Sequence, residues 1–462
     1  MFKLKQNNTT VRTELVAGIT TFMAMAYILM VNAGMFSTLG GDALGASYYN
    51  AVYIATALSA VFGTLLIGLL SNLPLAQASG MGLNAFFVYS VCIGMGFTYA
   101  NALVMVLVDG IVFLLLTVTG LRRLIFDAIP KAVKAAIAPG IGLFIAFLGL
   151  QNSGIVVNSD STLVDLHSFN IIFGHTTWAE IMPLLITIAA LIAIGAMSKK
   201  KIKGAVFWGI IGGAVLYYAL GLLTLDGFYA SNVQSKLSLN IIQPFRDFFN
   251  ISFGKVFTEG FNFSEYIAAN GVGSFAATFI ASMLAFCMVD MFDTLGTLYG
   301  ACSDGNVPNM NKAMLADAAA TCFGAVCGTS TVTTFVESSA GIAEGGKTGL
   351  SSVFTAAMFF IAMFLAPIAA LIPSCATAAS LIFVGILMIG GVKEIDWSDA
   401  SAAVPAFMTM AIMPFTYNIS YGIAFGLISY IFIKLFTGKI KDISLSTWII
   451  GILFAAMFFI AR

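Results

Sequence analysis

Residues 74–87 read Pro-Leu-Ala-Gln-Ala-Ser-Gly-Met-Gly-Leu-Asn-Ala-Phe-Phe, and they place one proline and two glycines inside an apolar segment of this chain. A second unusual segment, residues 328–341, reads Gly-Thr-Ser-Thr-Val-Thr-Thr-Phe-Val-Glu-Ser-Ser-Ala-Gly. Proline and glycine interrupt helices, and β-branched threonine favours extended backbone. We therefore expect both segments to be broken helices that include a short extended stretch.

The rest of the chain is dominated by long apolar segments. Of its 462 residues, 60% are hydrophobic and only 9% are charged, whereas a soluble domain carries about 25% charged residues. Segments of about 17–23 apolar residues recur from end to end, and each can cross about 30 Å of hydrocarbon. We expect an all-α polytopic membrane protein with about fourteen transmembrane spans. These lie at residues 14–36, 49–70, 74–93, 99–119, 132–151, 178–197, 204–224, 267–300, 311–328, 330–344, 351–372, 375–392, 400–417 and 419–437.

The distribution of basic residues predicts the orientation of these spans. If the N-terminus is cytoplasmic, most of the 21 lysine and arginine residues fall in cytoplasmic connections, which is the side that basic residues prefer. We therefore expect a multi-pass protein of the plasma membrane with a cytoplasmic N-terminus. A last apolar segment, residues 446–461, either spans the membrane once more or lies along its surface, and the sequence leaves this open.

The chain divides into two similar halves. Its longest and most polar connection, residues 225–266, separates a first repeat of seven spans (1–224) from a second (267–437), and a C-terminal apolar segment (438–462) follows. Because seven is an odd number, the second repeat enters the membrane from the opposite side, which makes the repeats inverted in topology. The residues that recur in the same order are Asn50 and Asn311, Phe62-Gly63 and Phe323-Gly324, Ile129-Pro130 and Ile372-Pro373, and Pro183 and Pro405.

Acidic residues inside the apolar segments mark a candidate site. The stretch 286–300 carries Asp290 and Asp293, although a charged group at the centre of a membrane helix costs about 2.5–3.5 kcal/mol. Residues three apart on a helix lie about 60° apart around its axis, so these two carboxylates can line one cavity. The two broken segments are each third of seven, with Asn84 and Glu337 at matching positions, as in discontinuous helices that meet at a transporter's central site. The alternative is that both segments are close-packed helix interfaces built from small residues.

Other residues leave more than one interpretation open. Asp317 either hydrogen-bonds to a broken helix or simply lies near the end of its span. One or two aromatic residues could stack on a flat heteroaromatic ligand, or they could only pack the interior. The six cysteines form no CxxC pair and both histidines fall in one polar connection, so we expect free thiols and no metal site. The aromatic candidates are Phe86, Phe87, Phe292 and Phe335.

Two other classes of membrane protein also place their functional groups inside the membrane-spanning segments. An intramembrane aspartyl protease needs two carboxyl groups brought face to face, usually from different helices, whereas Asp290 and Asp293 share one. An anion transporter or channel of the same inverted-repeat architecture favours a basic lining, whereas no lysine or arginine falls in the expected site. Cleavage of a membrane-anchored peptide and anion flux in liposomes are the assays that distinguish these classes.

Three motifs resemble one family. They are Gly-Met-Gly-Leu-Asn-Ala-Phe-Phe at 80–87, Asp-Met-Phe-Asp-Thr-Leu-Gly-Thr at 290–297 and Glu-Ser-Ser-Ala-Gly-Ile-Ala-Glu-Gly-Gly-Lys-Thr-Gly at 337–349. With the start of the first span, residues 12–27, they look like the AzgA-like adenine/guanine/hypoxanthine permease branch of the nucleobase–cation symporter 2 (NCS2, xanthine/uracil permease) family. The resemblance runs along essentially the whole chain.

The resemblance implies a core of spans 1–4 and 8–11 and a gate of spans 5–7 and 12–14. It implies a secondary active transporter, not an enzyme, that imports hypoxanthine, guanine or adenine, and in some members xanthine, by proton symport. From the two interrupted spans we further expect an elevator-type or rocking movement of the core against the gate to carry the base across the membrane. The expected partners are a purine base and the lipid bilayer, without nucleic acid and with a homodimer left open. No cofactor is expected besides the co-transported proton.

The roles of family residues transfer to matching positions. Two carboxylates, Asp293 and Glu337, would hydrogen-bond the purine. The coupled proton would be held by Asp290, Asp293 or Glu337, because burial among apolar groups favours the protonated form of a carboxyl group. Asp317 matches an acid that supports the site in relatives. The full substrate-binding set expected on this basis is Asp293, Glu337, Asn84, Phe86 and Ser338.

Overall fold

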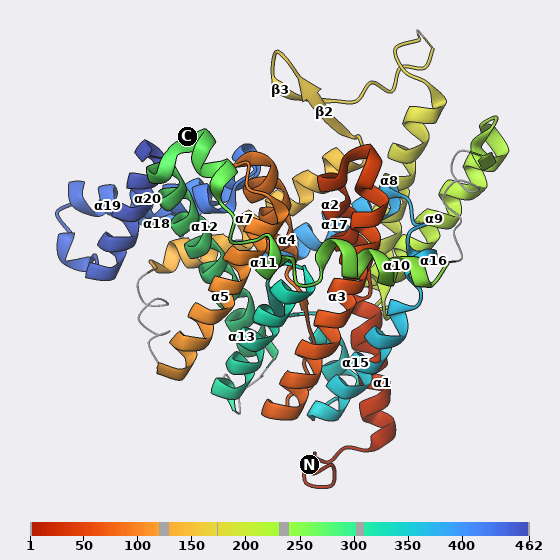
Figure 1. Ribbon diagram of the computed structural model, residues 1–462, viewed down its shortest axis with the longest axis horizontal. Coiled ribbons are helices and arrows are strands. Elements are labelled where there is room, and N and C mark those ends of the chain that lie inside the picture. Colours follow the sequence, from red (N-terminus) through yellow and green to blue (C-terminus); the bar gives the residue numbers. More distant parts are fainter. Residues whose placement is uncertain (1, 120–128, 173, 231–239, 302–308, 461–462) are drawn as a thin grey trace.

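The computed structural model describes residues 2–119, 129–172, 174–230, 240–301 and 309–460 (Figure 1). The fold is mostly helical, and long apolar helices run through it, which is a polytopic membrane architecture. The first repeat region contains α1 (Val11–Met25), α2 (Tyr27–Ser37), α3 (Gly41–Ser71), β1 (Gln77–Ser79), α4 (Met81–Ala85), the π-helical η2 (Phe86–Gly94), α5 (Tyr99–Thr119), α7 (Lys131–Asn152), β2 (Val156–Ser159), β3 (Leu163–Leu166), α8 (Trp178–Lys199) and α9 (Ala205–Thr224).

Short helices occupy the polar connection, and a second series of long helices follows it. The connection contains α10 (Ile242–Asp247), η4 (Phe248–Ser252) and α11 (Lys255–Thr258). The remaining elements are α12 (Ser264–Ala301), α13 (Met310–Cys327), β4 (Val332–Thr334), α14 (Ser338–Ala343), α15 (Gly349–Met363), α16 (Ala366–Ala369), α17 (Ser374–Met388), η5 (Ile389–Glu394), α18 (Ala400–Thr416), α19 (Ile419–Phe436), η6 (Ile440–Asp442) and α20 (Leu445–Ile460).

Helix bounds follow the apolar segments of the sequence closely. For example, α5 begins and ends with the expected segment 99–119. Within the described ranges, eight helical stretches are long and apolar enough to cross a membrane, which is fewer than the fourteen spans expected. One helical stretch of 61 residues, Val11–Ser71, contains two expected spans, because α1, α2, a 3-10 turn at Thr38–Gly40 and α3 follow one another almost without a break. The chain nevertheless reverses near Gly41 (φ 53°), so that α2 packs against α3. Several other expected spans, such as the one at α18, form shorter apolar helices of 10–17 residues.

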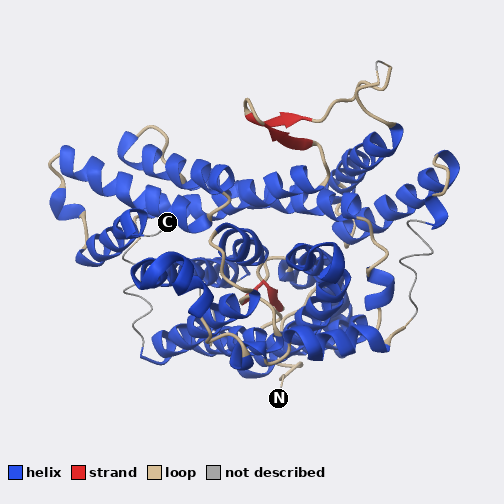
Figure 2. Cartoon of the chain, turned by 45° about the horizontal axis from the view of Figure 1, so that its top comes forward, coloured by secondary structure: helices blue, strands red, loops and turns tan. Residues whose placement is uncertain are grey.

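The extended stretches expected in the two broken segments are present as β1 and β4. They pair in antiparallel fashion, with Gln77 opposite Thr334, Ala78 opposite Thr333 and Ser79 opposite Val332. All three pairs are buried. Their pairing satisfies backbone groups that lipid could not satisfy, so this pair of strands can exist inside a membrane protein. In Figure 2 the pair lies among surrounding helices, whereas the β2–β3 hairpin projects from the molecule.

The helices pack as two sets. The first set comprises α1–α5 and α12–α15, and the second comprises α7–α9 and α17–α19. The most extensive helix pairings, such as α7 with α17, α18 with α19 and α3 with α15, join members of one set. Contacts between the sets are less extensive and include α2 with α17 and α4 with α7. Figure 2 shows the helices in two layers, so the molecule has an extended interface between two packed bodies.

A carboxylate in α1 anchors this helix to α15. The Glu14 side chain is fully buried, and its oxygens accept hydrogen bonds from the backbone N–H groups of Lys347 (3.1 Å) and Ser351 (3.2 Å). The positive end of a helix stabilises a carboxylate placed there. Two of the sequence motifs, at residues 12–27 and 337–349, therefore meet in this contact and hold the first set of helices together.

Candidate functional site

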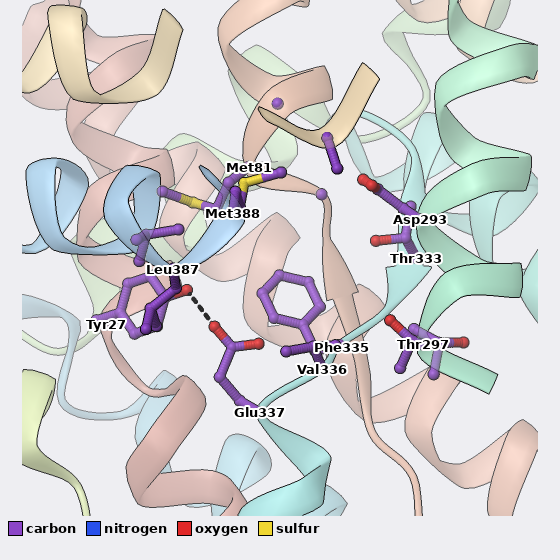
Figure 3. A pocket seen from close by; sticks show the side chains of 15 residues that line it. Tyr27, Met81, Asp293, Thr297, Thr333, Phe335, Val336, Glu337, Leu387 and Met388 are labelled. Carbon is purple, nitrogen blue, oxygen red and sulfur yellow. Dashed lines mark hydrogen bonds between the residues drawn. The ribbon is translucent and has the colours of Figure 1, made fainter. Parts of the chain in front are cut away.

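A cavity lies where the two sets of helices meet. Its volume is about 260 Å³. Elements α2, α4, α12 and the segment from β4 to α14 line it from the first set, and α7 and α17 line it from the second. The lining residues are Tyr27, Gly80, Met81, Gly82, Ala138, Asp293, Thr297, Thr333, Thr334, Phe335, Val336, Glu337, Val384, Leu387 and Met388 (Figure 3).

Two acidic side chains reach this cavity from different elements. Asp293 comes from α12, and Glu337 lies at the start of α14, three residues after the end of β4. Figure 3 shows the two carboxyl groups on different sides of the cavity, and the Phe335 ring lies between them in this view. Both acids are only partly buried. Each carboxyl group is therefore available to a ligand in the cavity.

The helical turn that follows β1 forms another part of the wall. Gly80, Met81 and Gly82 line the cavity at the start of α4, and the first N–H groups of a helix carry partial positive charge. Gly82 also permits the close approach of α4 to α7, because a Cβ atom there would stand 2.5 Å from Cγ2 of Ile141. Gly82 thus keeps the two sets of helices in contact beside the start of α4, where this helix lines the cavity.

Tyr27 is a cavity residue that the sequence analysis did not single out. Its hydroxyl donates a hydrogen bond of 2.8 Å to Oε1 of Glu337, across the space between α2 and α14 (Figure 3). The ring is almost fully buried, with 1% of its surface exposed. A tyrosine in the middle of an apolar span requires a hydrogen-bond partner for its hydroxyl group. This requirement is the feature of the sequence that could have marked Tyr27 as a candidate.

Asp290 and Asp317 lie behind the cavity rather than in its wall. Asp290 is fully buried, and its Oδ2 accepts a hydrogen bond of 3.4 Å from the Thr321 hydroxyl of α13. Asp317 is also fully buried, and its Oδ1 accepts hydrogen bonds from Gln77 Nε2 (2.8 Å), the Thr294 hydroxyl (2.8 Å) and the Thr334 hydroxyl (3.2 Å). Of the two interpretations left open for Asp317, the structure shows the first, since this carboxylate ties β1, β4 and α12 to α13.

Three further residues of the expected binding set are buried outside the cavity lining. The Asn84 side chain donates a hydrogen bond to the Ser79 carbonyl (3.3 Å) and accepts one from the Ser330 hydroxyl. The Ser338 hydroxyl accepts a hydrogen bond of 3.0 Å from the Ala76 N–H. Asn84 and Ser338 thereby connect the two broken segments. The Phe86 ring packs edge to face on Phe286, with the ring centroids 4.9 Å apart.

Of the other aromatic candidates, one lines the cavity and one is buried away from it. Phe335 lines the cavity, and 7% of its surface is exposed. Phe87 is fully buried and packs against Phe36, with 4.9 Å between ring centroids. The Phe292 side chain lies outside the described residues. Among the described aromatic candidates, Phe335 is therefore the one placed to contact a flat ligand.

The lining predicts what kind of molecule the cavity can bind. It combines apolar walls and an aromatic ring with two carboxyl groups and the hydroxyls of Thr297, Thr333 and Thr334. None of the lining residues described is lysine, arginine or histidine. The described part of the chain also contains no group of three or more His, Cys, Asp or Glu side chains that could hold a metal ion. This arrangement suits a small molecule with apolar faces that presents N–H donors.

Comparison with known sequences places the chain among transporters. The xanthine/uracil permease model, described as a permease family, matches residues 12–425. The guanine/hypoxanthine permease PbuO of Bacillus subtilis (strain 168) is 36% identical over 473 residues, which cover 100% of both chains. The adenine permease AdeP of Escherichia coli (strain K12) is 34% identical over 461 residues, which cover 98% of this chain and 94% of the relative.

Comparison with solved structures finds the general fold of this chain in another membrane transporter. The transmembrane domain of a cyanobacterial bicarbonate transporter, BicA, aligns with a TM-score of 0.61 at 15% sequence identity. The alignment covers 92% of this chain and 98% of that domain. The likeness shows a shared fold of membrane transporters and carries no information about the transported molecule.

Proposed function

Since this chain belongs to the xanthine/uracil permease family, and is therefore a multi-pass membrane transporter rather than an enzyme, we propose that it imports purine nucleobases by proton symport. The observation that carries the proposal is the pair of carboxyl groups, Asp293 and Glu337, in a small and otherwise largely apolar cavity. A purine is flat and presents ring and exocyclic N–H groups. A carboxylate that accepts such N–H groups forms strong, charge-assisted hydrogen bonds.

The size and walls of the cavity agree with a single base. Cavities for drug-sized ligands measure about 300–1,000 Å³, and a nucleobase is smaller than such ligands. The 260 Å³ found here is therefore of a suitable size. Phe335 offers a face for stacking, while Asp293 and Glu337 approach from different sides and so can bind different edges of the base. Relatives named for guanine, hypoxanthine and adenine support the purine class as a whole.

We further propose that the two sets of helices are a core and a gate that move against each other. The cavity lies at their interface, and the most extensive helix pairings stay within one set. A symmetric arrangement of two inverted repeats of seven spans is supported by the antiparallel pairing of β1 with β4. It is also supported by Phe62 and Phe323, which match each other in the two halves and stack with 4.1 Å between ring centroids. Elevator-type movement would carry the base bound to the core past the gate.

Proton coupling would be a property of the acidic side chains. The cavity described here has two carboxyl groups and lacks any basic residue, so ionising both without a counter-charge would be costly. A proton bound together with the neutral base would reduce the negative charge of the site. The proposed core could then carry the loaded site past the gate. We propose that Asp293 or Glu337 takes up this proton, with Asp290 behind them as a further candidate, in a plasma-membrane protein whose N-terminus is cytoplasmic.

The anion-transporter alternative gains support only from the fold. BicA transports bicarbonate, but its likeness to this chain at 15% identity is a likeness of architecture. An anion site requires positive charge or helix dipoles without competing carboxylates, and here two carboxyl groups face the cavity. The acidic lining therefore favours a neutral base over an anion.

Transport measurements test the proposed function directly. We expect cells that lack their own purine permeases to accumulate radiolabelled hypoxanthine, guanine or adenine when they express this chain. A protonophore should abolish the accumulation, and unlabelled uracil should compete poorly. Accumulation of none of the purines by protein that reaches the membrane would refute the proposal, and bicarbonate flux in liposomes would favour the anion alternative.

A further inference from the structure

We propose that Tyr27 is a positioning residue for the substrate: its hydroxyl holds the Glu337 carboxylate so that Oε2 faces the cavity. The inference rests on the proposed purine transport and adds a residue to its binding site. Tyr27 lies on α2, whereas Glu337 lies at the start of α14, more than 300 positions away in the sequence. Their contact is thus a product of the tertiary fold.

The two partners differ in how firmly the structure holds them. The Tyr27 ring is buried in the largest hydrophobic cluster and has 1% of its surface exposed, so its hydroxyl has a fixed place. Glu337 is partly exposed and follows Val336, which has 58% of its surface exposed. A glutamate side chain has several rotatable bonds, and holding it in one conformation costs up to about 2 kcal/mol of rotamer freedom. The tyrosine supplies a rigid anchor for this flexible acid.

Tyr27 is the side chain that restrains the acid. In the described part of the chain, its hydroxyl is the only side-chain group that hydrogen-bonds to the Glu337 carboxylate. The bond uses one lone pair of Oε1, whereas both lone pairs of Oε2 have no side-chain donor in the described residues, so we infer that Oε2 is the oxygen that accepts a base N–H. Without the hydroxyl, the carboxylate would lose this orientation, and binding of the base would have to include the cost of ordering it.

The same bond also affects the protonation of the site. A hydroxyl that donates to a carboxylate stabilises the ionised form, so its removal favours the protonated form of Glu337. The titratable groups that face this carboxylate from the cavity lining are Tyr27 itself and Asp293 of α12. The pH dependence of substrate affinity should therefore shift to higher pH when the hydroxyl is lost, whereas a purely structural contact would not produce this shift.

Tyr27→Phe tests the inference, and Tyr53→Phe is the matched control. The Tyr53 hydroxyl is also buried and donates a hydrogen bond of 3.0 Å, but to the Ala362 carbonyl, and Tyr53 is not part of the cavity lining. Tyr27→Phe should raise the KM for hypoxanthine by about tenfold, as loss of a hydrogen bond to a charged group predicts, with little change in maximal rate per transporter. It should also move the pH profile of KM upward, and Tyr53→Phe should do neither.

A second variant and a binding measurement on purified protein, which does not depend on delivery to the membrane, keep the test decisive if Tyr27→Phe reaches the membrane poorly. Glu337→Asp shortens the side chain and draws the carboxylate away from Tyr27, so it should raise the dissociation constant of purified protein for radiolabelled hypoxanthine. Combining Glu337→Asp with Tyr27→Phe should add little further loss, because the bond is already broken. Additive effects, or a Tyr27→Phe protein with parental KM and pH profile, would overturn the inference. Failure of the parental protein to transport any purine would instead refute the proposed function.

Discussion

Gly142 of α7 and Gly385 of α17 contact each other's backbone. A Cβ atom added at Gly142 would stand 2.7 Å from the Gly385 carbonyl oxygen, and one added at Gly385 would stand 2.4 Å from the Gly142 carbonyl oxygen. Each glycine follows, by the same number of residues, the proline that precedes its helix, Pro130 or Pro373. Reciprocal contact between equivalent residues is the hallmark of twofold symmetry. It supports the proposal that the two halves are inverted repeats.

Replacing either glycine should therefore destabilise the second set of helices. We expect Gly142→Ala and Gly385→Ala each to lower the free energy of unfolding by about 1–3 kcal/mol, because the new methyl group forces α7 and α17 apart. Thermal melting of the detergent-purified protein measures the effect. Gly212→Ala in α9 is the control, since nothing lies within 4 Å of a Cβ atom at that position. Equal melting temperatures for Gly142→Ala, Gly385→Ala and the control would show that the contact is not tight.

Removing either acid of the cavity should abolish transport without unfolding the protein. We expect Asp293→Ala and Glu337→Ala to reduce hypoxanthine uptake to background while the protein still reaches the membrane, because each side chain is partly exposed to the cavity. Uptake and surface labelling are measured on the same cells. Glu265→Ala is the control for α12, because Glu265 is an exposed acid in the first turn of that helix. Uptake by Glu337→Ala equal to that of the parent would remove Glu337 from the site.

Asp317→Ala should have a different effect from Asp293→Ala. Asp317 accepts three hydrogen bonds from β1, α12 and β4, and each buried donor left without a partner costs about 1–3 kcal/mol. We therefore expect Asp317→Ala to lose both thermal stability and uptake, whereas Asp293→Ala loses uptake alone. Melting curves of the two purified variants provide the comparison. A melting temperature for Asp317→Ala that matches the parent would mean that this network does not hold the strands in place.

A tether between the two sets of helices should stop transport. Lys203, between α8 and α9, forms an ion pair of 2.5 Å with Glu344, which follows α14, so the pair bridges the two sets. We expect a flexible thiol cross-linker between Lys203→Cys and Glu344→Cys to block uptake, because the proposed core can then no longer move past the gate. Lys255→Cys with Glu259→Cys is the control, since these residues are four apart, in and just after α11, which packs against α5 and α13 of the first set. Full uptake by the cross-linked Lys203/Glu344 variant would contradict movement at this interface.

The class of protein and the places where its spans break were predictable from the sequence. Apolar length and low charge are properties of local composition, so the bounds of α5 could be read without knowing what packs against it. Proline, glycine and threonine act on the backbone of their own segment, so residues 74–87 and 328–341 already indicated the stretches that became β1 and β4. The three motifs also indicated the family.

The tertiary structure decided which polar groups face the cavity. Asp290 and Asp293 differ by about 60° around α12, and this difference turns one toward Thr321 of α13 and the other into the cavity. Tyr27 entered the site only because α2 passes beside Glu337. The direction of a side chain relative to a cavity depends on how helices distant in sequence pack together. That packing is a property of the whole chain, and no single segment specifies it.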